Sequence, residues 1–120
     1  MIDLVKIAVD AMGGDSSPNK IIAGIIHHYK NNKDSYYQIF GDQNKIINLI
    51  NKDLPNTSFE IVHTIDTVKG TDSPLEGAKR GKKTSMWLAI QSVKEKKSDI
   101  VISAGNTGAL LVIAKLNLKM

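Results

Sequence analysis

The stretch from Asp99 to Gly108 constrains the fold most, because a strand, a turn of small residues and a helix follow one another directly. The three residues after Asp99 are all β-branched, which is typical of a strand buried on both faces. The turn from Ser103 to Gly108 holds two glycines and no bulky side chain, and the mostly apolar residues 109–118 are predicted as a helix. A helix N-terminus presents unpaired N–H groups, so the pattern predicts a phosphate-type site, although an ordinary capped turn would also favour these residues.

Hydrophobic spacing places this stretch at the end of an alternating series of strands and helices. The expected strands are Val5–Asp10, Tyr36–Phe40 and Phe59–His63, and the expected helices are Pro18–Lys30 with Ser17 as its N-cap, Gln43–Asn51, Pro74–Arg80 and Ser85–Lys96. This order predicts an α/β fold with a mainly parallel sheet and helices on both faces. Ligands bind beyond the carboxyl ends of such strands, so we expect the small-residue loops 11–17 and 103–108 to be neighbours.

Composition narrows the class of protein. The 120 residues fit one domain, and the absence of Cys excludes disulfides, thiolate zinc sites and a cysteine nucleophile. No apolar run is long enough for a membrane span and no secretory signal is evident, so a cytoplasmic location is expected. The net charge of +4 suits an acidic partner or a solvated lysine-rich surface, and no aromatic residues interleave with the lysines as a nucleic-acid site would require.

Two further groups of residues are candidates for chemistry. Asp10 and Asp15 flank Gly13 and Gly14, where two acids could orient a substrate, hold a cation or cap the next helix. Cations and hydroxyls also precede the expected helix at 85, and they suit either a phosphate or an ordinary cap; they are Arg80, Lys82, Lys83, Thr84 and Ser85. The three histidines lack metal-ligand spacing, so no metal site is expected.

The motifs Asp10-Ala-Met-Gly-Gly-Asp15, Thr84-Ser-Met86 and Ser103-Ala-Gly-Asn-Thr-Gly-Ala-Leu110 resemble those of the PlsX family, the phosphate acyltransferases of bacterial phospholipid synthesis. The resemblance runs from Val5 to the end of the chain and covers the N-terminal third of the family's length. It implies that residues 1–120 are one truncated segment of a larger Rossmann-like α/β/α domain, similar to phosphotransacetylases and isopropylmalate dehydrogenases.

The resemblance also implies an activity. Members of the family make acyl phosphate from acyl-acyl carrier protein and inorganic phosphate, and the product serves the acylation of glycerol 3-phosphate. They are cytosolic, usually homodimeric and peripherally associated with the membrane, and no cofactor or metal is expected. Two alternatives remain: a non-catalytic remnant that binds the carrier protein or another polypeptide, and a phosphate-using acyltransferase of the phosphotransacetylase type.

On this reading the motif residues divide into three groups around one anion. Asn106 is the candidate catalytic residue, and with Ser103, Gly105, Thr107 and Gly108 it would hold phosphate or the developing oxyanion. Asp10, Gly13, Gly14 and Asp15 would line the same cleft, and Arg80, Lys82, Thr84 and Ser85 would supply positive charge and hydroxyls.

Overall fold

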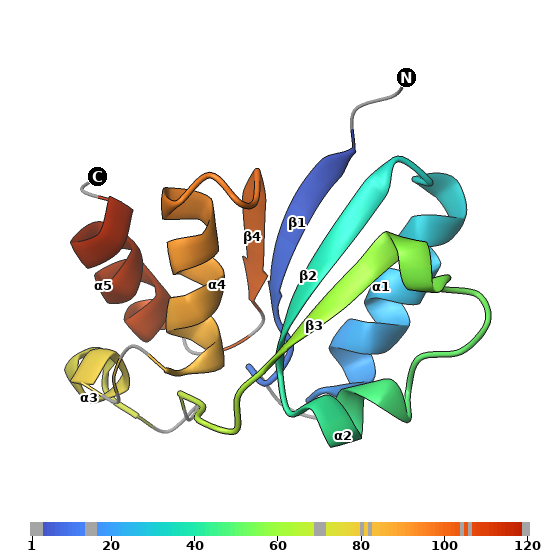
Figure 1. Ribbon diagram of the computed structural model, residues 1–120. Coiled ribbons are helices and arrows are strands. Elements are labelled where there is room, and N and C mark those ends of the chain that lie inside the picture. Colours follow the sequence, from blue (N-terminus) through green and yellow to red (C-terminus); the bar gives the residue numbers. More distant parts are fainter. Residues whose placement is uncertain are drawn as a thin grey trace.

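The computed structural model describes residues 4–13, 17–68, 72–79, 81, 83–103, 105 and 107–118. Strands and helices alternate along the chain (Figure 1). The strands are β1 (Val5–Asp10), β2 (Ser35–Gly41), β3 (Phe59–His63) and β4 (Ile100–Ser103). The helices are α1 (Asn19–Asn31), α2 (Gln43–Ile47), the 3-10 turn η1 (Asn56–Ser58), α3 (Pro74–Lys79), α4 (Ser85–Lys94) and α5 (Thr107–Leu118).

The described strands form one parallel sheet in the order β3-β2-β1-β4. The chain builds outward from β1 to β2 and β3, and then crosses back to place β4 on the other side of β1. This reversal beside β1 is the switch point of a doubly wound α/β sheet. The predicted fold class, a Rossmann-like α/β/α arrangement with a mainly parallel sheet, is confirmed for this part of the fold.

Alternate residues of β1 serve the two faces of the sheet. Ile7 and Val9 pack into a buried cluster with residues of α1 and α2, whereas Ala8 packs with Phe40 of β2 and Ala89 of α4. Helix α5 lies beside α4, where the buried side chains are Val68, Met86, Ile90, Ala109 and Ile113 (Figure 1). The helices therefore form one layer on each face of the sheet.

The expectation that the last strand is buried on both faces is wrong. Val101 packs under α4, but Ile100 and Ile102 are 47% and 42% exposed on the side of α1. The physical reason is position, because β4 is the outermost described strand and α1 covers its neighbour β1 instead. Composition alone does not distinguish a central strand from an edge strand with one uncovered face.

Several helix ends differ from those expected. Pro18, not Ser17, is the N-cap of α1, because the Ser17 hydroxyl donates to the Gly13 carbonyl instead of capping the helix. Helix α4 ends at Lys94, since Lys96 has a φ of 62° and helical geometry cannot continue through it. Helix α2 ends at Ile47, where the chain tightens into turns. None of the described helices has the length and apolar character needed to cross a bilayer.

Candidate functional site

The carboxyl ends of β1 and β4 lie side by side, because Asp10 pairs with Ser103 in the parallel register. The chain leaves these two ends toward opposite faces, since the loop after β1 leads to α1 and the loop after β4 leads to α5. In open α/β folds ligands bind between loops that diverge in this way, and we call the space outside these two strand ends the crevice. The expectation that the two loops are neighbours is confirmed by the contacts described next.

Asp10 joins three segments of the chain through a carboxylate that is almost fully buried, with 1% of the residue exposed. Its Oδ1 accepts hydrogen bonds from the Ser85 hydroxyl at 2.5 Å and from the Met12 N–H at 3.2 Å. Its Oδ2 accepts a hydrogen bond from the Ser103 hydroxyl at 2.9 Å. One side chain thus connects the end of β1, the start of α4 and the end of β4.

The net effect of the surroundings of Asp10 is to raise the pKa of its carboxyl group. Burial raises the pKa of this carboxyl above its ordinary value of 3.8, because an ionised carboxylate loses its hydration there. Hydrogen bonds from Ser85, Ser103 and the N–H groups of Met12 and Gly13 lower the pKa, but by less. The contacts of Asp10 show a side chain that holds the backbone of the site in place, a role that the sequence analysis did not include.

Gly13 and Gly105 bring the two loops into direct backbone contact. A Cβ added to Gly13 would lie 2.7 Å from Oδ2 of Asp10 and 2.9 Å from the nitrogen of Gly105. A Cβ added to Gly105 would lie 3.0 Å from the Cα of Gly13 and 3.1 Å from the Cε of Met86. Such distances leave no room for a side chain, so the absence of a Cβ at both positions is what lets the loops meet.

The amides of these two glycines point to acceptors within the protein. The Gly105 N–H donates to the Ser103 hydroxyl oxygen at 3.1 Å, and the Gly13 N–H interacts with the Asp10 carboxylate. Helix α5 begins two residues later at Thr107, and the first N–H groups of any helix lack acceptors in the helix itself. An anion in the crevice would therefore meet the first turn of α5, including Gly108, more readily than the amides of Gly13 and Gly105.

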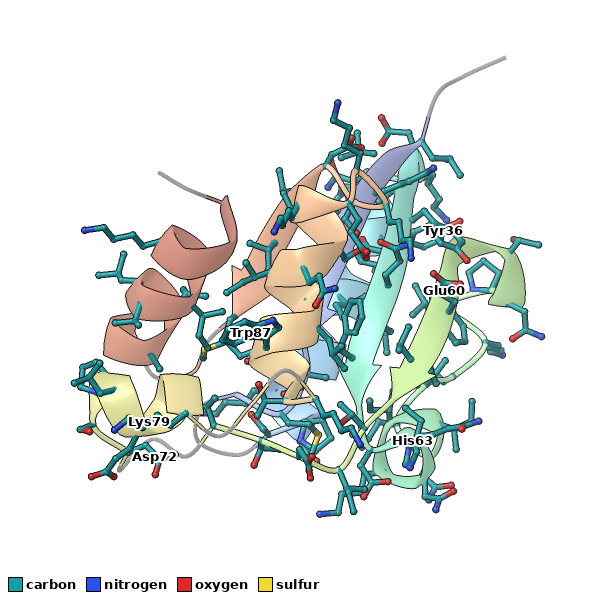
Figure 2. The ribbon with its side chains drawn as sticks, turned by 60° about the vertical axis from the view of Figure 1, so that its left-hand side comes forward. Tyr36, Glu60, His63, Asp72, Lys79 and Trp87 are labelled. Atoms are coloured by element: carbon teal, nitrogen blue, oxygen red, sulfur yellow. The ribbon has the colours of Figure 1, made fainter. Side chains whose placement is uncertain are left out.

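The hydroxyls of Thr84 and Ser85 are both engaged at the start of α4. Oγ1 of Thr84 accepts the N–H of Trp87, which Figure 2 labels on α4, at 3.2 Å, and thereby caps the helix. The Thr84 hydroxyl also donates to the Gly81 carbonyl at 3.2 Å, while the Ser85 hydroxyl is bound to Asp10. The structure thus brings Ser85 to the site and places Thr84 beside it as a fully buried cap.

Five of the expected site residues lie outside the described residues: Gly14, Asp15, Arg80, Lys82 and Asn106. Their proposed roles stay predictions. Within the described ranges, no group of three or more His, Asp and Glu side chains is arranged to hold a metal ion. Two histidines have polar partners within the protein: Nδ1 of His28 lies 2.6 Å from the Tyr37 hydroxyl, and Nδ1 of His63, which Figure 2 labels, accepts the Gln43 N–H at 3.0 Å.

The segment after β3 also supports the site, and no pattern in the sequence indicated this. The Thr64 hydroxyl donates to the Lys83 carbonyl at 2.5 Å, and the Ser85 N–H donates to the Asp66 carbonyl at 3.0 Å. These bonds fix the position of the first turn of α4, and therefore of the Ser85 hydroxyl that reaches Asp10. The sequence predicts only an irregular stretch here, because the bonds join residues that are far apart along the chain.

A comparison with known families assigns the chain to one of them. The sequence profile of the family described as "Fatty acid synthesis protein" matches residues 5–120, which is almost the whole chain. The chain belongs to this family, that of the PlsX phosphate acyltransferases. The resemblance noted in the sequence is therefore confirmed, and the matched residues include both loops that meet at Gly13 and Gly105.

Individual relatives of this family member are also named phosphate acyltransferase. The chain is 78% identical over 120 residues to the protein from Pelagibacter ubique, an alignment that covers 100% of the chain and 36% of that protein. It is 47% identical over 105 residues to the protein from Streptococcus thermophilus, covering 88% of the chain and 30% of the relative. For Listeria monocytogenes the identity is 44% over 107 residues, covering 89% and 31%. The chain thus spans about a third of the length of these relatives.

Proposed function

We propose that this chain contributes the phosphate site of a phosphate acyltransferase that converts acyl-acyl carrier protein and inorganic phosphate into acyl phosphate for phospholipid synthesis. In this reaction an oxygen of hydrogen phosphate attacks the thioester carbonyl carbon. The new C–O bond forms as the C–S bond breaks, and the proton of hydrogen phosphate ends on the thiol of the released carrier protein. No bond to the enzyme is needed, which suits a chain without Cys.

The observation that supports the proposal most is the close contact of Gly13 and Gly105 beside the first turn of α5, in a chain that belongs to this family. An acyl transfer of this type needs two groups held together and donors for the oxyanion that develops on the carbonyl. The first turn of α5 beside this contact would offer the donors, because the N–H groups at a helix N-terminus are held in place before the substrate arrives.

The proposed roles combine the structure of the described residues with the family resemblance of the others. Thr107 and Gly108 would bind phosphate through the amides that begin α5, and Asn106 would donate to the phosphate or the oxyanion. Gly14 and Asp15 would line the cleft, and Arg80 and Lys82 would supply positive charge. The remaining site residues shape the crevice rather than face it; these are Asp10, Gly13, Thr84, Ser85, Ser103 and Gly105.

The proposed partners follow from charge and family. The acyl carrier protein is expected to be acidic, and the net charge of +4 on this chain would favour its approach. For the whole protein we propose a cytoplasmic homodimer with peripheral contact to the membrane, as the resemblance implies. Location, dimerisation and membrane contact are properties of the whole protein, and this chain spans 36% of the length of the Pelagibacter relative.

The test is the formation of acyl phosphate from acyl-acyl carrier protein and inorganic phosphate, trapped with hydroxylamine as the hydroxamate. The assay is run on this chain and on the Pelagibacter relative. Each protein is compared with its Asn106→Ala variant, or the equivalent substitution. Asn56→Ala, on the exposed 3-10 turn, is the matched control. Loss of one oxyanion donor lowers turnover by about a hundredfold, so the Asn106 variant should fall by that order while the free energy of unfolding stays close to that of the parent.

The outcomes separate the candidate functions. Acyl phosphate formed from the carrier thioester, with loss only in the Asn106 variant, supports the proposal. Binding of the carrier protein without turnover by this chain would instead identify a non-catalytic remnant. Turnover with acyl-coenzyme A but not with the carrier thioester would identify an enzyme of the phosphotransacetylase type. Equal turnover of the Asn106 variant and its parent would remove Asn106 from the mechanism.

A further inference from the structure

Gly24 stands in the interior of α1, where glycine is among the least favourable residues. No close contact requires a glycine there, since a Cβ at this position would have no atom within 4 Å, whereas the glycines of the two loops are crowded. Gly24 lies on the same side of the helix as Ile21, Ile25 and His28, which are three or four residues away. The missing side chain therefore leaves an open space in the middle of this stripe.

That space belongs to an apolar groove between α1 and β4, with a volume of about 230 Å³. Ile21 and Gly24 of α1 form one wall, and Ile102 of β4 forms part of the other. Ile7 and Val9 of β1, which are buried, lie between the two walls. Because the lining is almost entirely aliphatic, the groove suits an apolar ligand.

The groove follows α1 along most of its length. Lys20 lines it at the first turn of the helix and His28 lines it near the end, which corresponds to roughly 12 Å at the usual rise per residue. At the far end the Tyr37 hydroxyl lies 2.6 Å from Nδ1 of His28, and both side chains line the groove. A small volume spread over this length fits a single unbranched chain better than a bulky group.

The near end of the groove adjoins the crevice. Val9 and Ile102 line the groove, and the residues that follow them, Asp10 and Ser103, are the paired ends of β1 and β4. Helix α1 also begins on this side, because it follows the carboxyl end of β1. A hydrocarbon chain held in the groove would therefore present its head group at the loops where the proposed acyl transfer takes place.

Charge gives the groove a direction. Lys20 is the only Lys, Arg, Asp or Glu among the described residues that line it, and it lies at the end nearest the crevice. The first turn of α1 contains no acidic residue, and the N-terminus of a helix favours negative charge. The groove thus fits an amphiphile whose anionic head lies near Lys20 and whose apolar tail runs toward Tyr37. A fatty acyl group that receives phosphate has this chemistry.

From these observations we infer that the groove between α1 and β4 holds the fatty acyl chain of the thioester and of the acyl phosphate, and that the open space at Gly24 sets the chain length that fits. The inference rests on the proposed function, because it assigns a second substrate group to the same reaction. It makes Gly24 a specificity-determining position, since any larger side chain there would shorten the groove.

The test measures chain-length preference in the full-length Pelagibacter relative, in which all of its own polypeptide that could cover the groove is present. Acyl phosphate formation is followed with hexanoyl and palmitoyl thioesters of the carrier protein, and kcat/KM is determined for each. Gly24→Leu, at the equivalent position, is compared with the parent. Ala23→Leu is the matched control, because Ala23 is exposed on the same helix and lies outside the lining of the groove.

In Gly24→Leu the ratio of kcat/KM for palmitoyl to that for hexanoyl thioester should fall by about tenfold or more, because each methylene group that leaves an apolar site loses binding energy. Ala23→Leu should keep the parental ratio. The melting temperature of Gly24→Leu should not fall, since Leu is a better helix former than Gly and the groove has room for it.

A second measurement needs no turnover. The isotopically labelled chain is titrated with decanoate below its micellar concentration, and the methyl shifts of its isoleucines are followed. Saturable shifts should appear at Ile21 and Ile102 and disappear in Gly24→Leu. Ile65, which is 71% exposed and lies outside the groove lining, is the control and should not respond.

Three results would overturn the inference: a parental chain-length ratio in an active Gly24→Leu variant, a lower melting temperature of that variant, which would show that the relative's own polypeptide fills the groove, or decanoate shifts no larger at Ile102 than at Ile65. Failure of the proposed function has a different signature, because the parent relative would then form no acyl phosphate from either thioester. In that case the decanoate titration decides whether the groove takes an acyl chain.

Discussion

Oδ2 of Asp10, at the end of β1, accepts a hydrogen bond from the hydroxyl of Ser103, at the end of β4, at 2.9 Å. These residues are 93 positions apart in the sequence, and the bond lies where the strand order of the sheet reverses. Because the Ser103 oxygen in turn accepts the Gly105 N–H, the bond links β1 to the loop that leads into α5. The shape of the crevice thus depends on a buried carboxyl group.

Removing the Asp10 carboxyl should destabilise the chain. In Asp10→Ala the hydroxyls of buried Ser85 and half-buried Ser103 lose their acceptor, which costs about 1–3 kcal/mol in the free energy of unfolding. Urea unfolding followed through the fluorescence of Trp87 measures this change. Asp53→Ala, at an exposed turn, is the matched control and should change stability by less than about 0.5 kcal/mol. Equal stability of the two variants would show that the Asp10 contacts contribute nothing.

The raised pKa of Asp10 predicts a pH dependence with a definite sign. The folded state holds the Asp10 proton more tightly than the unfolded state, whose pKa is near the ordinary 3.8. The contribution of this group to stability is therefore greatest below pH 3.8 and falls as the pH rises from there through the raised pKa of the folded state.

Comparison of the parent with Asp10→Asn isolates this contribution, because Asn does not titrate. The free energy of unfolding is measured for both proteins from pH 3 upward, and the difference, parent minus variant, should decrease as the pH rises. A difference that increases over this range would mean that the folded state lowers the pKa of Asp10, contrary to the effect of its burial.

Alanine should have opposite effects on stability at crowded Gly13 and at open Gly24. In Gly13→Ala the new Cβ would lie 2.7 Å from Oδ2 of Asp10, so the two loops must separate at a cost of about 1–3 kcal/mol. In Gly24→Ala, on α1, the new Cβ meets no atom within 4 Å, and the better helix propensity of Ala should stabilise the chain by up to about 1 kcal/mol. Thermal unfolding of both variants provides the comparison, and a Gly13 variant as stable as the parent would contradict the observed packing.

The sequence was informative where the physics is local. Hydrophobic spacing predicted the bounds of β1 and β3 correctly and a helix at α1, in which Ile22 and Ile25 are buried. The rule that parallel strands bind ligands at their carboxyl ends was enough to place the loops after Asp10 and Ser103 together. Both inferences need only neighbouring residues or a general rule of topology.

The sequence did not predict features that depend on contacts between distant segments or on an unusual backbone conformation. The exposure of Ile102 depends on which strand α1 covers, and the engagement of the Ser85 hydroxyl depends on Asp10, 75 residues away. The end of α4 depends on the left-handed backbone of Lys96, which its residue type does not favour. The sequence left open whether Thr84 and Ser85 serve a phosphate or an ordinary cap, and the structure shows Thr84 as the cap and Ser85 as a donor to Asp10.

The most direct test of the phosphate site is a titration of the isotopically labelled chain with inorganic phosphate, followed by the chemical shifts of its backbone amides. If the loops after β1 and β4 form the site with the first turn of α5, saturable shifts should appear at Thr107 and Gly108 and, more weakly, at Gly13 and Gly105. The amides of Gly24 and Gly41 should not respond. Sulfate at the same ionic strength controls for general anion effects. Shifts that do not saturate, or that are as large at Gly24 as at Gly108, would contradict a phosphate site at this crevice.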